Sequence, residues 1–323
     1  MSTDGADRLT EALFSSSPEE LETWAPELRR WRDELGVPFT FHTDAAAIPA
    51  GKVDVLILNP VEGAKDLSPY RGAKLIQSTW AGVERFLGNA TVPEGPVLCR
   101  MVEPGLAESM TDYICGHVLR AHLDIDHWIR LSAEGRWEPR FPPLSRHRKV
   151  GLLGLGELGE DAARMLSRLR FDVAGWSRSP KTIEGVETFH GAEGLRALLA
   201  RSDILVTILP LTTATRHILN AETLALLPMG ATIVNPGRGP LIDDEALLAA
   251  LASGRVGRAT LDVFAAEPLP AGHPYWGHPQ VTVTPHIAAE TRAASAARVV
   301  VEQIGRLTRG EALHHVVDRG RGY

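Results

Sequence analysis

The chain has 323 residues, of which 44% are hydrophobic, so it can bury a substantial core and has the length of about two domains. Its net charge is −6, with acidic and basic residues interspersed. This balance argues against a general binder of nucleic acid or anionic membranes, and a small anionic substrate would need a local positive site.

Cysteine content and the N-terminal residues narrow the class of protein further. Cys99 and Cys115 are the only cysteines, so no disulfide framework, zinc-ligand spacing or metal site is expected. The stretch 1–22 is polar and acidic, without the apolar core of a signal peptide or the character of a transit peptide. No apolar run approaches the roughly 20 residues of a membrane span. We therefore expect a protein of the reducing cytoplasm.

The first third of the chain reads as alternating helices and strands. Ser17, Pro18 and Glu20 have the pattern of a capped helix start, and Pro26 predicts the start of a second short helix. Three apolar runs follow, and we predict a buried strand over each of them: 53–59, 73–79 and 95–101. This alternation favours a parallel α/β architecture.

A second α/β series occupies the middle of the chain. The periodicity over 111–131 predicts one long helix, and the proline-rich segment 136–148 predicts a loop. From Lys149 onward we predict strands over 150–154, 172–177, 203–210, 231–236, 258–263 and 281–285. Helices are predicted over 160–170, 193–201 and 243–253. This pattern indicates a doubly wound sheet, which binds ligands beyond the carboxyl ends of its strands.

A glycine fingerprint follows the first strand of this series. Gly154, Gly156 and Gly159 have the G-x-G-x-x-G spacing between a predicted strand and a predicted helix. In that setting the glycines allow a tight turn, close approach of a pyrophosphate and close helix–strand packing. The alternative is a glycine-rich turn without a ligand.

The end of the next predicted strand lacks an expected acid. A carboxylate there usually binds the adenosine ribose, but this chain has Ser177, Arg178, Ser179 and Lys181. An arginine pairs with a 2′-phosphate, which a carboxylate would repel. The stretch therefore predicts a preference for NADPH. The alternative is a solvated basic turn of no consequence.

Three side chains of suitable chemistry follow the later strands. A protonated His286 can neutralise the oxygen of a carbonyl that receives a hydride, and Glu267 can favour and orient the imidazolium. Arg238 can hold a substrate carboxylate and keto oxygen. Asp262 can accept a bond from the nicotinamide amide. Taken singly, Arg238, Glu267 and His286 each fit a surface, turn or strand-end role better, and only together with the glycine loop do they favour a catalytic site.

These stretches together resemble one family over nearly the whole chain. The matching motifs are "GLGELG", "GWSRSPK", "VNPGRGPLIDDEALLAAL", "ATLDVFAAEPLP", "VTPHIAAETR" and the ending "VDRGRGY". They resemble the D-isomer-specific 2-hydroxyacid dehydrogenases, and within them the glyoxylate/hydroxypyruvate reductase A group.

The resemblance implies an architecture and an activity. It implies two Rossmann-like or flavodoxin-like α/β domains with doubly wound parallel sheets and a cleft between them. A substrate domain would comprise 1–108 and 290–323, and a dinucleotide domain 109–289, with hinges near 106–112 and 287–293. It also implies NADPH-dependent reduction of a small 2-ketoacid to a D-2-hydroxy acid by Arg238, Glu267 and His286.

The resemblance also assigns ligand-contacting positions. Those expected to contact NADP, or NAD, are Gly154, Gly156, Glu157, Leu158, Gly159, Ser177, Arg178, Ser179, Lys181, Leu209, Pro210, Pro236, Gly237, Asp262, His286 and Ala288. Ala81 and Gly82 would hold the substrate carboxylate, and Arg238 and Trp80 would also contact the substrate. Trp80 is atypical, because the group usually has a small residue at that position. Asn59 stands where the group often has an aromatic residue.

The family usually forms homodimers, and Trp128 and Trp137 suit an interface, an active site or a core.

Two other functions remain compatible with the sequence. One is oxidation of a larger or phosphorylated D-2-hydroxy acid, which would use basic residues of the first domain such as Arg71, Lys74, Arg85 and Arg100. The other is a non-enzymatic dinucleotide sensor, like the transcriptional corepressors of this fold. A sensor would bind the cofactor without turning over a ketoacid.

Overall fold

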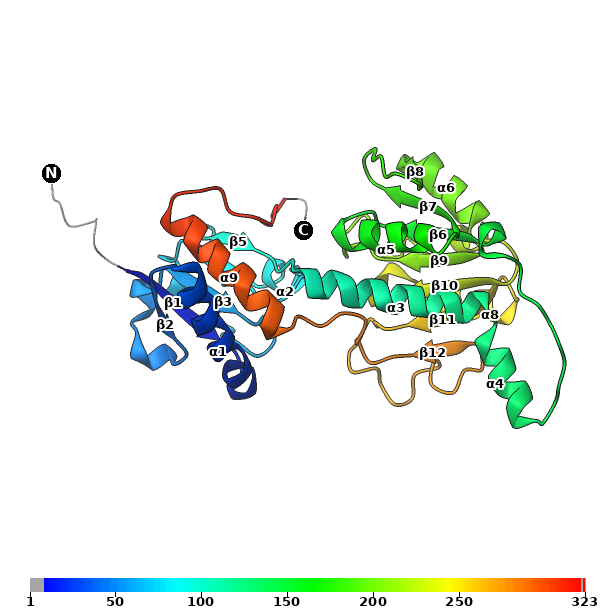
Figure 1. The fold of residues 1–323 in the computed structure, drawn as a ribbon, viewed down its shortest axis with the longest axis horizontal. Helices are drawn as coiled ribbons and strands as arrows, with labels where there is room; N and C mark the ends of the chain where they lie inside the picture. Colours follow the sequence, from blue (N-terminus) through cyan, green and yellow to red (C-terminus); the bar gives the residue numbers. More distant parts are fainter. Residues whose placement is uncertain (1–8, 321, 323) are drawn as a thin grey trace. The chain divides into compact units, whose positions relative to one another are not determined.

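The computed structural model describes residues 9–320 and residue 322. Residue contacts divide the chain into two units. The first unit comprises the chain up to Leu106 together with the segment from Thr291 onward, and the second unit is Ala107–Glu290. Each unit has its own parallel sheet (Figure 1). The predicted fold class, two doubly wound α/β sheets, is confirmed. Residues 1–8 of the polar N-terminal stretch, and 321 and 323 of the "VDRGRGY" ending, lie outside the described residues.

The first unit has a five-stranded sheet with the order β2-β1-β3-β4-β5. Its strands are β1 (Thr10–Ser15), β2 (Phe39–His42), β3 (Val55–Leu58), β4 (Leu75–Ser78) and β5 (Val97–Cys99). All of its strand pairs are parallel. The central strands β3 and β4 are buried along their whole length, which explains their continuous apolar sequence.

Helices cover both faces of this sheet. On one face, α1 (Pro18–Leu35) packs beside α9 (Ala293–Thr308), so the end of the chain completes the first unit (Figure 1). The other face is covered by α2 (Glu84–Leu87) and by short 3₁₀ segments. The expectation that a second helix begins at Pro26 is wrong, because Pro26 lies inside α1. It occupies the exposed side, while Trp24 and Leu28 on either side of it are buried in the core.

The second unit has a seven-stranded sheet, ordered β12-β11-β10-β9-β6-β7-β8 and parallel throughout. Its strands are β6 (Lys149–Leu153), β7 (Asp172–Ser177), β8 (Glu187–His190), β9 (Ile204–Thr207), β10 (Ala231–Asn235), β11 (Val256–Leu261) and β12 (Val281–Val283). The chain runs outward from β6 to β8 and then returns to the other side at β9. The strand order therefore reverses between β6 and β9, and ligands of such sheets bind at that point.

Two layers of helices enclose this sheet (Figure 1). On one face lie α3 (Pro104–His122) and α5 (Glu157–Arg168), and on the other α6 (Gly191–Arg201), α7 (Ala221–Leu224) and α8 (Asp244–Ala252). Within the described part of the chain, no helix is long and apolar enough to cross a membrane.

The single helix expected over 111–131 is in fact two helices, α3 and α4 (Ile125–Ala133). Asp124 separates them in the left-handed conformation, with φ +54°. Its carboxylate pairs with Arg140 at 3.1 Å and with Arg258 at 2.8 Å. Both partners lie outside the segment 111–131, and Arg258 is far away along the chain, so the periodicity of that segment gave no sign of the break.

Each unit contains one buried, free cysteine. Cys99 ends β5 in the first unit, and Cys115 lies on α3 in the second. Burial raises the pKa of Cys99 to about 12 and that of Cys115 to about 11. Both thiols are therefore protonated and unreactive in the folded protein at neutral pH.

Candidate active site

The glycine fingerprint forms a tight connection between β6 and α5. Gly154 has φ +112°, and a Cβ atom there would lie 2.6 Å from the carbonyl oxygen of Ile208, which follows β9. A Cβ atom on Gly159 would lie 2.1 Å from the carbonyl oxygen of Gly154. Both positions therefore admit only glycine, and the loop lies where the strand order reverses.

Gly156 leaves the start of α5 open. It is the N-cap of the helix, makes no side-chain cap, and a Cβ atom there would meet nothing within 4 Å. The N–H groups at a helix start and the helix dipole favour an anion. Beside Gly156, Glu157 is exposed and Leu158 packs against the core. This cradle fits the pyrophosphate of a dinucleotide.

The turn after β7 gathers positive charge. Ser177 is buried, and its Oγ donates to the carbonyl of Ser179 at 2.7 Å. The ammonium of Lys181 donates to the carbonyl of Leu155 in the glycine loop. Arg178 is exposed on the turn, and residues 177–181 contain no acidic side chain. The turn therefore offers cations and no carboxylate to an incoming phosphate.

The other positions expected to contact the cofactor follow strand ends. Leu209 and Pro210 come after β9, Pro236 and Gly237 after β10, and Ala288 after β12. All except Pro210 are buried. The strands are parallel, so these positions belong to the same edge of the sheet as the glycine loop.

A buried polar network shapes the loop that carries Arg238. The Thr207 hydroxyl donates to Asn235 Oδ1 at 2.6 Å, and the Gly237 amide donates to the same oxygen at 3.1 Å. Asn235 Nδ2 donates to the carbonyl of Arg238 at 3.0 Å, and the Arg238 guanidinium donates to the Gly237 carbonyl at 2.7 Å. Sequence reasoning missed Thr207 and Asn235, although polar residues ending two buried strands were a usable signal.

Glu267 and His286 form a direct pair. His286 Nδ1 lies 2.7 Å from Glu267 Oε2, and the Phe264 amide donates to Glu267 Oε1 at 2.9 Å. The side chain of His286 is 42% exposed and that of Glu267 is 36% exposed, so a solute can reach both. The contact through Nδ1 leaves Nε2 of His286 available to a reacting oxygen.

The electrostatics of Glu267 favour its charged form. Burial acts to raise the pKa of this carboxyl. The hydrogen bonds from His286 and from the amide of Phe264 oppose burial, and together with nearby positive charge they hold the pKa of Glu267 below its ordinary value. The positive charge of Arg238 acts in the same direction, so the three predicted residues interact within one site.

Asp262 makes its bonds within the protein. It is fully buried, and its carboxylate accepts the Thr284 hydroxyl at 2.6 Å and the amides of Ile287 and Ala288 at 2.9 and 2.8 Å. Its backbone carbonyl accepts the amide of His286 at 2.9 Å. A contact from Asp262 to a nicotinamide amide stays a prediction.

The predicted substrate-binding positions belong to the first unit and follow β4. The Trp80 amide donates to Ser78 Oγ at 2.9 Å, and its carbonyl accepts the Met101 amide at 3.0 Å. Trp80 is 36% exposed, which does not suit a core residue, and Ala81 and Gly82 are half-buried.

Asn59, which replaces the aromatic residue that the resemblance would place there, has a local structural role. Its Oδ1 accepts the amides of Val61 and Glu62 at 2.8 and 3.0 Å, and its Nδ2 donates to Glu20 at 2.8 Å. The side chain is only 3% exposed. Asn59 therefore fixes the turn after β3.

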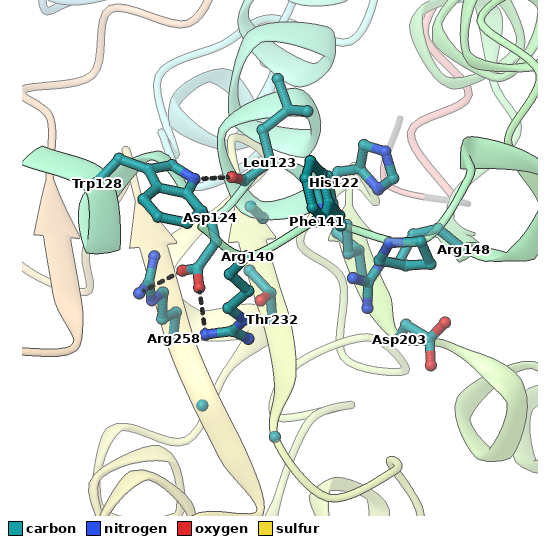
Figure 2. Close-up of a pocket in the computed structure, with 16 residues that line it drawn as sticks. His122, Leu123, Asp124, Trp128, Arg140, Phe141, Arg148, Asp203, Thr232 and Arg258 are labelled. Carbon is teal, nitrogen blue, oxygen red and sulfur yellow. Dashed lines mark hydrogen bonds and ion pairs between the residues drawn. The ribbon is translucent and has the colours of Figure 1, made fainter. Parts of the chain in front are cut away.

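A cavity of about 230 Å³ lies at the other edge of the second sheet (Figure 2). Its walls include Asp203 just before β9, Thr232 at the start of β10 and Arg258 near the start of β11, so it is at the amino ends of the strands. Trp128 also lines it and donates through its indole to the Leu123 carbonyl at 2.8 Å. This cavity is separate from the glycine loop and the Glu267–His286 pair.

The comparisons with known proteins agree with this geometry. Residues 115–288 match the family model of the D-isomer specific 2-hydroxyacid dehydrogenase, NAD binding domain. The glyoxylate/hydroxypyruvate reductase A of Serratia proteamaculans is 40% identical over 248 residues, which cover 75% of this chain and 79% of the relative.

Solved structures are similar over almost the full chain. A D-isomer specific 2-hydroxyacid dehydrogenase from Xanthobacter autotrophicus Py2, in complex with NADPH and MES, has a TM-score of 0.91 at 37% identity, covering 98% of this chain and 100% of that one. The NADPH-dependent glyoxylate/hydroxypyruvate reductase of Sinorhizobium meliloti, in complex with NADP and sulfate, has a TM-score of 0.85 at 33% identity, covering 97% and 100%. The protein is thus an NAD(P)-binding member of the D-isomer specific 2-hydroxyacid dehydrogenase family.

Proposed function

We propose that the protein reduces a small 2-ketoacid, glyoxylate or hydroxypyruvate, to the D-2-hydroxy acid with NADPH as the preferred cofactor. The observation that carries this proposal is the 2.7 Å contact between His286 and Glu267, within the electrostatic reach of Arg238. The basic turn at Arg178 and Lys181 supports NADPH, as do the relatives solved with NADPH or NADP.

The proposed mechanism assigns one step to each side chain. The nicotinamide, when bound, supplies a hydride to the keto carbon. His286 donates the proton on Nε2 to the oxygen of that carbonyl and is left neutral. Arg238 binds the anionic substrate and orients the carbonyl toward His286. A proton taken up from the solvent then restores the imidazolium.

Glu267 prepares His286 for this step. Its carboxylate accepts from Nδ1, which fixes the ring so that Nε2 carries the transferable proton. Its charge also offsets the cost of holding an imidazolium near Arg238.

We propose that the two units divide the binding of ligands. Ala107–Glu290 would bind the dinucleotide, and the first unit would hold the substrate carboxylate through the backbone N–H groups of Ala81 and Gly82. Trp80 would limit the size of the substrate. The domain limits, the hinges and a cytoplasmic location stay predictions.

The test of this function is a set of initial rates with glyoxylate and with hydroxypyruvate, each with NADPH and with NADH. Turnover with a strong NADPH preference supports both the reaction and the assignment of the basic turn. Turnover with an NADH preference keeps the reductase but contradicts the NADPH assignment. No turnover with either substrate, together with tight cofactor binding, contradicts the proposed substrates, and a wider panel of ketoacids then separates an enzyme from a sensor.

Replacing Glu267 with glutamine should slow ketoacid reduction, because the neutral amide cannot accept the charge-assisted hydrogen bond that orients the His286 ring through Nδ1. Turnover at neutral pH should fall about tenfold, the effect of one lost charge-assisted hydrogen bond. In the wild type the lowered pKa of Glu267 keeps this carboxylate ionised through mildly acidic pH.

The matched control for this variant is glutamine at Glu193, which is exposed on α6. Its turnover should match that of the wild type. Turnover that stays at the wild-type level after substitution of Glu267 would show that this carboxylate does not prepare His286 for proton transfer.

We also propose that two chains form a homodimer through the segment after α3. Large apolar side chains are exposed there at Ile129, Trp137, Phe141 and Leu144, and Trp137 and Phe141 are 94% and 90% exposed. Burying such side chains is the usual driving force of association. Sedimentation should give twice the mass of one chain, and the Trp137→Ser, Phe141→Ser double variant should dissociate more readily. A wild type that sediments as one chain would contradict the dimer.

A further inference from the structure

A chain of hydrogen bonds links α3 to the candidate general acid. The hydroxyl oxygen of Tyr113, on α3, lies 2.7 Å from Thr284 Oγ1. The hydroxyl of Thr284 donates to Asp262 Oδ1 at 2.6 Å. We propose that Tyr113 is a positioning residue for His286, a role that rests on the function proposed above.

The carboxylate of Asp262 holds the segment that contains His286. It accepts the amide of Ile287 at 2.9 Å through Oδ1 and the amide of Ala288 at 2.8 Å through Oδ2. The amide of His286 itself is 2.9 Å from the carbonyl oxygen of Asp262 and 3.1 Å from that of Thr284. Both the side chain and the backbone of Asp262 therefore fix the backbone at positions 286–288.

This support matters because the backbone of His286 is strained. Its φ is +55°, in the left-handed region that a residue with a Cβ atom seldom adopts. Such a conformation persists only when its surroundings hold it. The backbone of His286 also determines where its imidazole ring lies. In the proposed mechanism Nδ1 of that ring contacts Glu267 and Nε2 faces the substrate.

Tyr113 is the first donor in the chain of hydrogen bonds that runs from Tyr113 through Thr284 to Asp262. Thr284 has one hydroxyl proton, which it gives to the carboxylate of Asp262. Its oxygen can therefore only accept from Tyr113, whose O–H is the donor. Tyr113 fixes the rotamer of Thr284 and thereby one of the bonds that hold Asp262 in place.

Tyr113 is suited to remain a donor. It is half-buried on α3, its ring centroid is 4.4 Å from that of His117, and burial raises the pKa of its phenol. The hydroxyl thus stays protonated across the range in which the enzyme would work. Tyr113 need not touch the substrate or the cofactor to act in this way.

The first test is the Tyr113→Phe variant, which removes only the hydroxyl. We expect kcat for ketoacid reduction to fall about tenfold, the loss of one well-formed hydrogen bond, with KM for the ketoacid unchanged. The matched control is Tyr275→Phe, since the hydroxyl of this buried tyrosine likewise donates a hydrogen bond to another side chain, to the carboxylate of Asp244 at 2.8 Å. Tyr275→Phe should lose similar stability but keep kcat.

Thr284 variants test the path of the effect. Thr284→Val should match Tyr113→Phe or exceed it, and Tyr113→Phe should then add little in the Val background, because both changes break the same chain. Thr284→Ser keeps the hydroxyl and should restore kcat. Fully additive losses, or a Ser variant as impaired as the Val variant, would overturn the proposal.

A measurement without turnover separates this proposal from the proposed function. Hydrogen exchange at the amides of Ile287 and Ala288 should be faster in Tyr113→Phe than in the wild type and unchanged in Tyr275→Phe. If the wild type reduces no ketoacid, this exchange still tests whether Tyr113 holds the segment. Unchanged exchange, or equal loss of kcat in both tyrosine variants, would overturn it.

Discussion

Replacing His286 with alanine should lower kcat for ketoacid reduction about a thousandfold, within the range that general acid catalysis contributes. Without the imidazole no side chain is held by Glu267 to protonate the carbonyl oxygen, so negative charge would develop there without neutralisation. Affinity for NADPH should change by no more than about twofold, the size of an ordinary surface effect. The measurements are steady-state kinetics and a fluorescence titration of the cofactor.

The control for this variant is His147→Ala, which removes an exposed histidine far along the chain from the Glu267 pair. It should behave like the wild type. If His286→Ala retained the wild-type kcat, His286 would not be the proton donor, and a loss confined to NADPH affinity would make it only a binding residue.

Replacing Arg178 with alanine should weaken NADPH binding about thirtyfold and leave NADH binding within about twofold, because charge-assisted bonds to a phosphate are worth far more than ordinary surface contacts. NADPH differs from NADH by the 2′-phosphate, so a selective loss identifies the group that the arginine contacts. Dissociation constants for both cofactors, measured at one salt concentration, check this expectation.

Two further variants sharpen the Arg178 experiment. Arg146→Ala removes another exposed arginine of the same unit and should change neither constant. Arg178→Asp should move the preference toward NADH, because a carboxylate repels the 2′-phosphate and binds the ribose hydroxyl. Equal losses of both cofactors in Arg178→Ala would contradict a 2′-phosphate site.

The features that sequence could predict are those with a local cause. The glycine fingerprint requires close backbone approaches over six residues, and the structure has those approaches at Gly154 and Gly159. The strands at the centre of both sheets are buried on two faces, so each has a continuous apolar sequence from which a strand could be predicted, as at β3 and β9. The doubly wound arrangement then follows from the alternation of such strands with helices.

Features with distant causes were missed or misplaced. At the break between α3 and α4, Asp124 pairs with Arg258, and α1 continues through Pro26 with Trp24 and Leu28 buried on either side of it. The strands β1, β2 and β8 were not predicted. In β8, whose sequence is ETFH, no residue is fully buried, so this edge strand carries no apolar run. Contacts such as that of Tyr113 with Thr284 join residues separated by 171 positions and leave no local pattern.

The two buried cysteines can be used to measure local unfolding of each unit. Because Cys99 and Cys115 belong to different units, a thiol reagent added under native conditions would modify each only when its own unit exposes it. Mass spectrometry of the two labelled peptides would then report the opening of the two units separately, without an engineered label. A bound dinucleotide would be expected to protect Cys115 more than Cys99, so the same reaction locates the unit that the cofactor stabilises.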